Sequence, residues 1–230
     1  MKTTALALAG ILSAAPAAWA SAPPAPSVAL ISKTILDVTR QSGGGEWERA
    51  LRGEALASGD RVRTGLRSLA IVKFLDNSLV RIRERSELTV TGESRGGSLT
   101  KTVNLDRGVV GFNIRKQRSD EEFRFTSPTS VASIRGTGGQ LSAQASSDTL
   151  TVIEGAVLLT NRISERSITV RAGFTGISAA DGSILERPST PAERQAAMQA
   201  SRSGDRNNLL ELELRNDGGQ KRRLRIEYRE

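Results

Sequence analysis

Closely spaced turn residues are the feature that most constrains the fold of this chain. From Val28 to about Leu185, short apolar or alternating runs are separated every several residues by glycine or by turns that contain asparagine. No helical period interrupts these runs. Short strands punctuated in this way are typical of all-β proteins. We therefore expect an all-β domain over residues 28–186.

Several runs also predict which side chains are buried. In "EFRFT", Phe123 and Phe125 share one face while the polar residues share the other. The run Leu69 to Leu75, "LAIVKFL", is almost continuously apolar and is expected to be buried on both sides. The "DNS" that follows it predicts a turn in which Asn77 takes a positive φ angle.

A helical pattern appears only near the C-terminus, in "STPAERQAAMQASRSG". Thr190 is the expected N-cap, Pro191 the first helical residue, and Glu193 the second half of a capping box. Gly204 is placed to end the helix. We therefore predict one helix from about Pro191 to Ser203.

The last segment, residues 209–228, predicts an antiparallel hairpin with its turn at "NDGG". Leucines alternate with glutamates in its first half, and arginines alternate with apolar residues in its second half. This pattern places Glu211 and Glu213 opposite Arg223 and Arg225. We treat residues 187–230 as an extension of helix and hairpin that the main domain does not need for folding.

The N-terminus resembles a secretory signal peptide. Lys2 is followed by an apolar stretch, and small residues stand before an expected cleavage site between Ala20 and Ser21. Residues 1–20 are thus expected to be removed, residues 21–27 to form a disordered leader, and the mature protein to be periplasmic or secreted without a membrane span. Because the chain has no cysteine, it can have no disulfide framework.

Composition disfavours several functions. The formal charge is +8, but the arginines are interleaved with carboxylates, as in "VRIRERSEL", and are interpreted as solvated strand faces. Aromatic residues make up only 3% of the chain, which disfavours binding of single-stranded nucleic acid by base stacking. With no histidine, a transition-metal site or other cofactor is not expected.

No catalytic motif is complete. The glycines in "RGTGGQ" match neither a dinucleotide fingerprint nor a phosphate loop, and they predict a bend in a β structure. A carboxylate-only hydrolase is a rival interpretation, with Asp60, Asp76, Asp106 and Glu154 as its candidates. Each of these acids adjoins turn residues, which explains it without catalysis. We therefore expect no enzyme activity.

Several motifs stand together in an order that closely resembles the FecR domain, a periplasmic module named after a bacterial iron-citrate regulator. The resemblance extends from about Gly53 to Gly176, through "GDRVRTG", "FLDNS", "SPTSVASIRGTGG" and "IEGAV". Its motif residues, to which the resemblance gives structural or interaction roles, are Gly59, Asp60, Arg63, Thr64, Gly65, Asp76, Ser78, Pro128, Arg135, Gly136, Thr137, Glu154 and Gly155.

The resemblance implies a solenoid-like stack of short strands without enzyme activity. Asn77 replaces the glycine that is usual in the family's Asp-Gly-Ser turn. Members that regulate iron uptake carry a cytoplasmic anti-sigma segment and a membrane helix before this module, where this chain has the expected signal peptide. We therefore do not expect this chain by itself to contact a sigma factor in the cytoplasm.

The function expected from these observations is binding, with another envelope protein as the partner and the terminal helix and hairpin as contact surface or cap. The alternative is a cell-wall or carbohydrate-binding module, with a glycan as ligand. Trp47, the single tryptophan left after cleavage, offers little aromatic surface for sugars.

Arg135 carries a separate hypothesis. Its position before the glycines of "RGTGG" suggests a guanidinium that satisfies buried turn carbonyls or one carboxylate, with Asp60, Asp76 or Glu154 as partner. The competing interpretation is an exposed anion-binding site.

Overall fold

The structure is a computed structural model, and it describes residues 27–95, 98–202, 208–215 and 221–228. The expected signal peptide and nearly all of the leader lie outside these residues. Strands β1 to β17 form one continuous hydrogen-bonded network that does not close into a barrel. The predicted all-β class is confirmed, whereas the solenoid-like stack is not confirmed.

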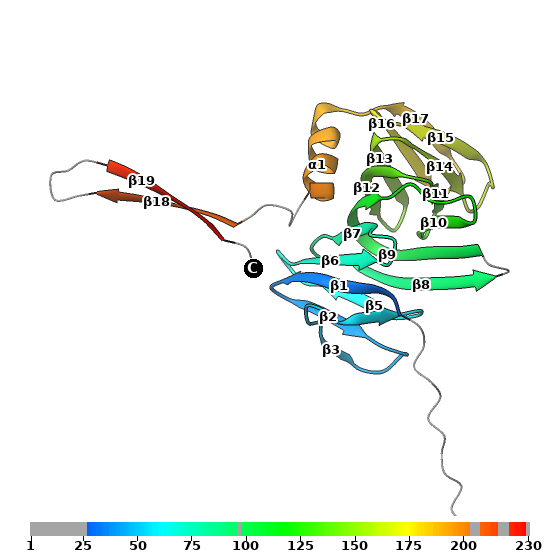
Figure 1. The fold of residues 1–230 in the computed structure, drawn as a ribbon. Helices are drawn as coiled ribbons and strands as arrows, with labels where there is room; N and C mark the ends of the chain where they lie inside the picture. Colours follow the sequence, from blue (N-terminus) through cyan, green and yellow to red (C-terminus); the bar gives the residue numbers. More distant parts are fainter. Residues whose placement is uncertain (1–26, 96–97, 203–207, 216–220, 229–230) are drawn as a thin grey trace, which may run out of the picture.

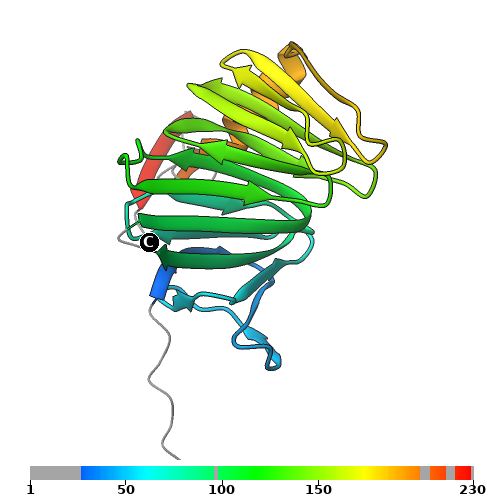
Figure 2. The same cartoon turned by 90° about the vertical axis from the view of Figure 1, so that its right-hand side faces the viewer.

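The strands are arranged in two layers that share β9 (Ser98–Ile114) (Figure 1). The first half of β9 pairs with one layer and its second half, from Gly108, pairs with the other. All strand pairs are antiparallel except β9 with β10. Successive strands are stacked along the length of the molecule (Figure 2).

We call one layer the helix-covered sheet. In order, its other strands are β4 (Ala55–Ala57), β1 (Ser27–Ile35), β6 (Leu69–Phe74), β7 (Leu79–Ile82), then β9, β12 (Thr137–Ala143), β13 (Ser147–Glu154), β16 (Phe174–Ala179) and β17 (Ile184–Pro188).

We call the other layer the open sheet. In order, its strands are β3 (Trp47–Arg49), β2 (Val38–Gln41), β5 (Arg61–Thr64), β8 (Glu87–Arg95), then β9, β10 (Glu121–Thr126), β11 (Ser130–Ile134), β14 (Ala156–Asn161) and β15 (Ser167–Arg171).

One hydrophobic core lies between the two layers. Phe123 and Phe125 point inward from the open sheet and are fully buried, while Arg124 between them is exposed. Their rings meet rings of the helix-covered sheet, Phe74 and Phe112, at centroid distances of 4.9 and 5.0 Å. The alternation predicted for "EFRFT" is therefore confirmed, and burial of these rings joins the layers.

Tight corners carry the chain from one layer to the other. Most of these corners contain a residue with positive φ, a conformation that residues other than glycine rarely adopt. The positive-φ residues at these corners are Leu36, Gly53, Gly59, Arg67, Arg85, Gly136, Gly155 and Gly173. Within the turn that joins β6 to β7, Asn77 has a φ of 65°, as predicted. The burial predicted for residues 69–75 is confirmed over β6 except at Lys73, which is half-buried. It is wrong at Leu75, which is exposed because the turn begins there.

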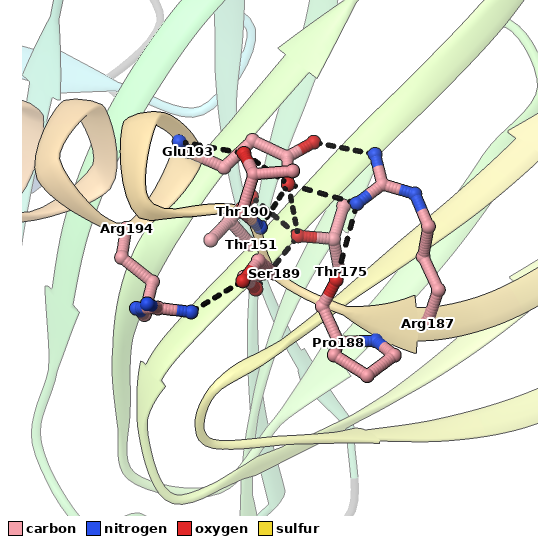
Figure 3. A network of polar contacts seen from close by, with 8 residues as sticks. All are labelled: Thr151, Thr175, Arg187, Pro188, Ser189, Thr190, Glu193 and Arg194. Atoms are coloured by element: carbon pink, nitrogen blue, oxygen red, sulfur yellow. Dashed lines mark hydrogen bonds and ion pairs between the residues drawn. The ribbon is translucent and has the colours of Figure 1, made fainter.

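Helix α1 (Pro191–Arg202) begins at the predicted residue. The Thr190 amide donates to Glu193 Oε2 at 2.8 Å, and the Glu193 amide donates back to Thr190 Oγ1 at 3.2 Å, which confirms the capping box. Arg187 of β17 binds both carboxylate oxygens of Glu193 (Figure 3). These contacts hold α1 against β9, β12 and β13, on the outer face of the helix-covered sheet.

The C-terminal hairpin consists of β18 (Asn208–Arg215) and β19 (Lys221–Tyr228), which pair with each other in a separate two-stranded sheet. Its backbone register places Glu211 opposite Arg225 and Glu213 opposite Arg223, which confirms the predicted pairing. The hairpin extends away from the two layers (Figure 1). Gly204 and the turn of the hairpin lie outside the described residues.

Candidate functional site

Several motif residues lie in the corners between the layers. The Gly65 amide donates to the Asp37 carbonyl at 2.9 Å, and the Gly65 carbonyl accepts from the Arg85 amide at 3.1 Å. The Thr64 hydroxyl accepts from the Ser86 amide at 3.1 Å. Three successive corners are thereby tied together, so Thr64 and Gly65 have a structural role here.

The motif residues Gly136, Thr137 and Gly155 form a second set of packed corners. The Thr137 hydroxyl donates to the Ala156 carbonyl at 3.1 Å. A Cβ atom at Gly155, where φ is +80°, would lie only 2.7 Å from the Gly136 carbonyl oxygen. The predicted tight bend of the glycine-rich stretch against a neighbouring turn is observed. Glycine is required at 155 both by φ and by space.

Asp60 closes the turn between β4 and β5, which contains the motif residue Gly59. The Asp60 side chain is buried and accepts hydrogen bonds from the Ser42 hydroxyl at 2.8 Å and from the Ala57 amide at 3.0 Å. Arg40 Nη1 lies 3.9 Å from its carboxylate. This acid therefore fixes a turn rather than facing a pocket.

Asp76 and Ser78 form the turn between β6 and β7 together with a buried lysine. The Ser78 amide and hydroxyl both donate to Asp76, at 2.9 and 3.0 Å. Lys101 Nζ donates to Asp76 Oδ2 at 2.5 Å, and Gln117 donates to the same oxygen at 2.9 Å. Burial acts to raise the pKa of Asp76, but these hydrogen bonds outweigh it and hold the pKa below its usual value.

The "SPTS" turn surrounds a buried acid that the sequence did not single out. Asp148, at 0% exposure, accepts hydrogen bonds from the hydroxyls of Ser127, Thr129 and Ser130. The Thr129 amide also donates to it, at 3.2 Å. Pro128 lies exposed between these residues. The turn is therefore held by a carboxylate from β13, 18 or more residues away.

Arg135 does not occupy the buried position that was hypothesised. Its side chain is exposed at the end of β11, and its positive charge contributes to lowering the pKa of Glu122. The proposed partners Asp60 and Asp76 bind other groups, and Glu154 is itself exposed. The hypothesis failed because Arg135 is exposed, and the corner is held by the Gly136–Gly155 contact and the Thr137 hydroxyl instead.

An arginine and tryptophan cluster on the open sheet is the strongest candidate for a binding site. We call it the arginine surface, and it comprises Trp47, Arg49, Arg61, Arg63, Glu87, Asp106 and Arg107. Glu87 lies at its centre and is only 3% exposed. Arg63 Nε donates to Glu87 Oε2 at 3.1 Å, Arg107 Nη2 donates to the same oxygen at 2.7 Å, and Arg61 Nη2 donates to Oε1.

The charge of Glu87 is maintained by these arginines. Burial acts to raise the pKa of Glu87, but the hydrogen bond from Arg63 and the positive charges of all three arginines hold it below its usual value. The ionised carboxylate in turn fixes the three guanidinium groups. Side-chain exposures of 38% for Arg61 and 63% for Arg107 leave them accessible to a ligand.

Trp47 lies at the edge of this surface, on β3. The guanidinium carbon of Arg63 is 4.0 Å from the centroid of the Trp47 ring, and that of Arg61 is 5.4 Å away. These are cation–π distances. The ring remains partly exposed. Tryptophan and arginine are the residue types most enriched in the energetically important part of protein interfaces.

Sequence reasoning named Arg63 as a motif residue but missed the cluster. The arginines were interpreted as solvated strand faces, and their meeting depends on the register of β5, β8 and β9. The alternation of "RVRT" and the isolated Trp47 were the available signals. Neither one specifies which strands become neighbours.

The four acids considered as catalytic carboxylates of a hydrolase have different surroundings. Asp60, Asp76 and Asp106 accept hydrogen bonds from different neighbours, and Glu154 is exposed at a corner. In the described part of the chain, no group of three or more acidic, histidine or cysteine side chains could hold a metal ion. No helix of that part combines the length and apolar content needed to cross a membrane.

Comparison with known proteins identifies the β module. Residues 60–158 match the family model described as FecR protein. These residues are the part of the chain that is similar to a FecR domain. The matched region includes Arg61, Arg63, Glu87 and Arg107 of the arginine surface, whereas Trp47 and Arg49 precede the matched residues. The resemblance stated from the sequence is thus confirmed.

Solved structures show the same fold. Two crystal structures of a candidate anti-sigma factor from Parabacteroides distasonis ATCC 8503 superpose with TM-scores of 0.52 and 0.51, each at 15% sequence identity. Each match covers 60% of this chain and 64% of the other chain, so this chain spans less than two thirds of those proteins. No curated protein matches the sequence.

Proposed function

We propose that this chain is an exported, non-catalytic FecR-domain protein that binds another protein of the bacterial envelope and acts in signalling. The observation that carries the proposal is the arginine surface, where a partly exposed Trp47 and preorganised guanidinium groups share one open sheet face. The FecR match and the likeness in fold to a candidate anti-sigma factor support a regulatory role.

The surface differs from the contact region expected from sequence. Helix α1 lies across a sheet face and is itself partly buried there through Ala197 and Ala200, so its inner side is occupied. The open sheet has no corresponding helix among the described residues. The contact surface that we propose is therefore the open sheet around Trp47.

Site-specific photo-crosslinking in cells tests this proposal. A photoreactive phenylalanine analogue at position 47 replaces one aromatic ring by another, and the same analogue at Thr169 of β15 serves as control on the outer face of the same sheet. We expect a protein adduct in the envelope fraction from position 47 and none from position 169. The free protein should have the mass of a chain that begins at Ser21.

The proposal would be overturned by equal adducts at both positions, or by no adduct from protein that is exported and folded. A mass that retains residues 1–20 would contradict the export part alone.

A further inference from the structure

Arginines recur at every second strand along one row of the open sheet. Each residue of the row pairs with the next one on the neighbouring strand. The row runs from Arg49 on β3 through Thr39 on β2, Arg63 on β5 and Glu87 on β8 to Arg107 on β9. Directly opposite residues of antiparallel strands have their side chains on the same face. Since neighbouring strands are about 4.8 Å apart, the Cα atoms of successive arginines in this row stand about 10 Å apart. The guanidinium groups of Arg63 and Arg107 nevertheless converge on Glu87 Oε2.

The arginine surface carries a net positive charge. It contains four arginines and two carboxylates, which gives it a net charge of +2. The arginines are Arg49, Arg61, Arg63 and Arg107, and the carboxylates are Glu87 and Asp106. Clustered positive charge on one face attracts an anionic ligand and accelerates its association.

Guanidinium donors at this surface are fixed in place and partly free. Arg63 uses Nε and Arg107 uses Nη2 to bind Glu87. Their side chains are nevertheless 41% and 63% exposed. Since an arginine has five N–H donors, each can bind a further carboxylate while Glu87 holds its orientation. Preorganised donors bind a ligand with less loss of side-chain entropy.

The spacing of the row suits an extended peptide. Alternate residues of an extended strand lie on the same side, about 6.8 Å apart. Carboxylates two residues apart would therefore match the guanidinium groups of Arg63 and Arg107, which converge on Glu87 Oε2. A run of acidic residues favours extended conformations because its charges repel one another. Trp47, two residues before Arg49 on β3, offers an aromatic contact at one end of the row.

The geometry points to an acidic, extended peptide segment of the partner protein as the ligand of the arginine surface. This inference rests on the proposed function, because it names the chemistry of the partner that the function requires. Carboxylates of the segment bind Arg49, Arg63 and Arg107, and Glu87 acts as the positioning residue that holds two of these three.

A binding titration with a defined probe tests the inference. The probe is a fluorescein-labelled, end-blocked peptide of six glutamates, and a blocked peptide of six serines is the uncharged comparison. With the full chain we expect saturable binding of the glutamate peptide, none of the serine peptide, and weaker binding as the NaCl concentration rises. No binding of the glutamate peptide would overturn the inference.

Two double variants with the same charge change locate the site. Arg63→Gln with Arg107→Gln keeps amide donors for Glu87 and should weaken binding at least tenfold. Arg166→Gln with Arg171→Gln, near the far end of the open sheet, should change affinity less than twofold. Arg49→Gln alone, at an exposed position, should weaken binding two- to fivefold and does not depend on the Glu87 contacts. Equal weakening by both double variants would overturn the inference in favour of general charge attraction.

Further outcomes separate this inference from the proposed function. A crosslink at position 47 that the Arg63→Gln, Arg107→Gln variant leaves unchanged would support a protein partner but overturn the acidic segment. Peptide binding without any crosslink in cells would support the acidic segment and contradict the proposed function. Tenfold tighter binding of a polyuronate than of the peptide would overturn the acidic segment in favour of a glycan. A dimer that is seen in light scattering and abolished by the same variant would overturn it in favour of a second copy of this chain.

Discussion

The outer face of the helix-covered sheet lies under α1 at β9, β12 and β13, whereas the outer face of the open sheet meets solvent around Trp47. On the covered face, Thr151 and Thr175 are 2% and 0% exposed, and their hydroxyl oxygens lie 3.2 Å apart. Thr175 also contacts the Ser189 hydroxyl at 2.8 Å, just before the helix (Figure 3). On the open face, Arg63 and Arg107 keep large exposed surfaces.

The difference shows what covering a polar sheet face requires. Short hydroxyl side chains satisfy one another, and Gly111 of β9 leaves room for the helix backbone at Ala200. Small residues on the inner side of α1, Ala197 and Ala200, complete this close contact. A long cationic side chain is also accommodated on this sheet, since Arg81 of β7 lies opposite Gly111 and is 1% exposed. The arginines of the arginine surface, by contrast, keep exposed guanidinium groups. They remain available for a charged ligand instead.

The largest expected effect comes from closing the space under the helix. A Cβ atom at Gly111 would lie 2.2 Å from the Ala200 carbonyl, so Gly111→Leu should lower the free energy of unfolding by about 1–3 kcal/mol and displace α1. Gly138→Ala is the matched control, since its nearest atom is 3.9 Å away. Urea denaturation and proteolysis of α1 measure both effects. An unchanged stability of the leucine variant would show that the helix is not held on this face.

A smaller effect is expected from the link between α1 and β17. The hydrogen bonds from Arg187 lower the pKa of Glu193 to about 2. Glu193→Ala should reduce stability by about 0.3–1.5 kcal/mol, and Glu193→Gln, which retains an acceptor for the cap, should reduce it less.

The pH dependence of this effect has a definite sign. Because the folded pKa lies below the ordinary value of 4.5, the contribution of Glu193 is fully present above pH 4.5 and is lost as the pH falls toward 2. Thermal denaturation of wild type and Glu193→Gln between pH 7 and pH 2 should therefore show curves that converge at low pH. A constant difference would mean that the charge of Glu193 does not stabilise the helix.

The smallest effect on stability is expected on the open face. Trp47→Leu removes the cation–π contacts with Arg61 and Arg63, which should lower the free energy of unfolding by less than about 1 kcal/mol. The same change should weaken partner binding, since a contact surface contributes to affinity more than to folding. A stability loss as large as that of Gly111→Leu would remove the distinction between the two faces.

Much of the local structure was predictable from the sequence. The burial of Phe123 and Phe125, the positive φ of Asn77 and the capping box of α1 follow from alternation and turn chemistry within a few residues. The register of the terminal hairpin followed from its turn sequence and charge pattern. The tight bend at Gly136 was also anticipated, although Arg135 was assigned the wrong role beside it.

The binding surface could not be predicted in the same way. Arg63 and Arg107 meet at Glu87 only because β5, β8 and β9 are neighbours in one register, and a shift by one residue would move these side chains to the other face. The burial of Asp148 under the "SPTS" turn depends likewise on the pairing of distant strands.

The sequence by itself determined the all-β class, the start of the helix and the alternation of strands such as β10, because these depend on side-chain periodicity and capping along a few residues. The tertiary structure decided which polar face α1 covers and which arginines gather on the face left open. Those outcomes depend on contacts between residues far apart in the chain, and the space beside Gly111 and the register around Glu87 exist only once both layers have formed.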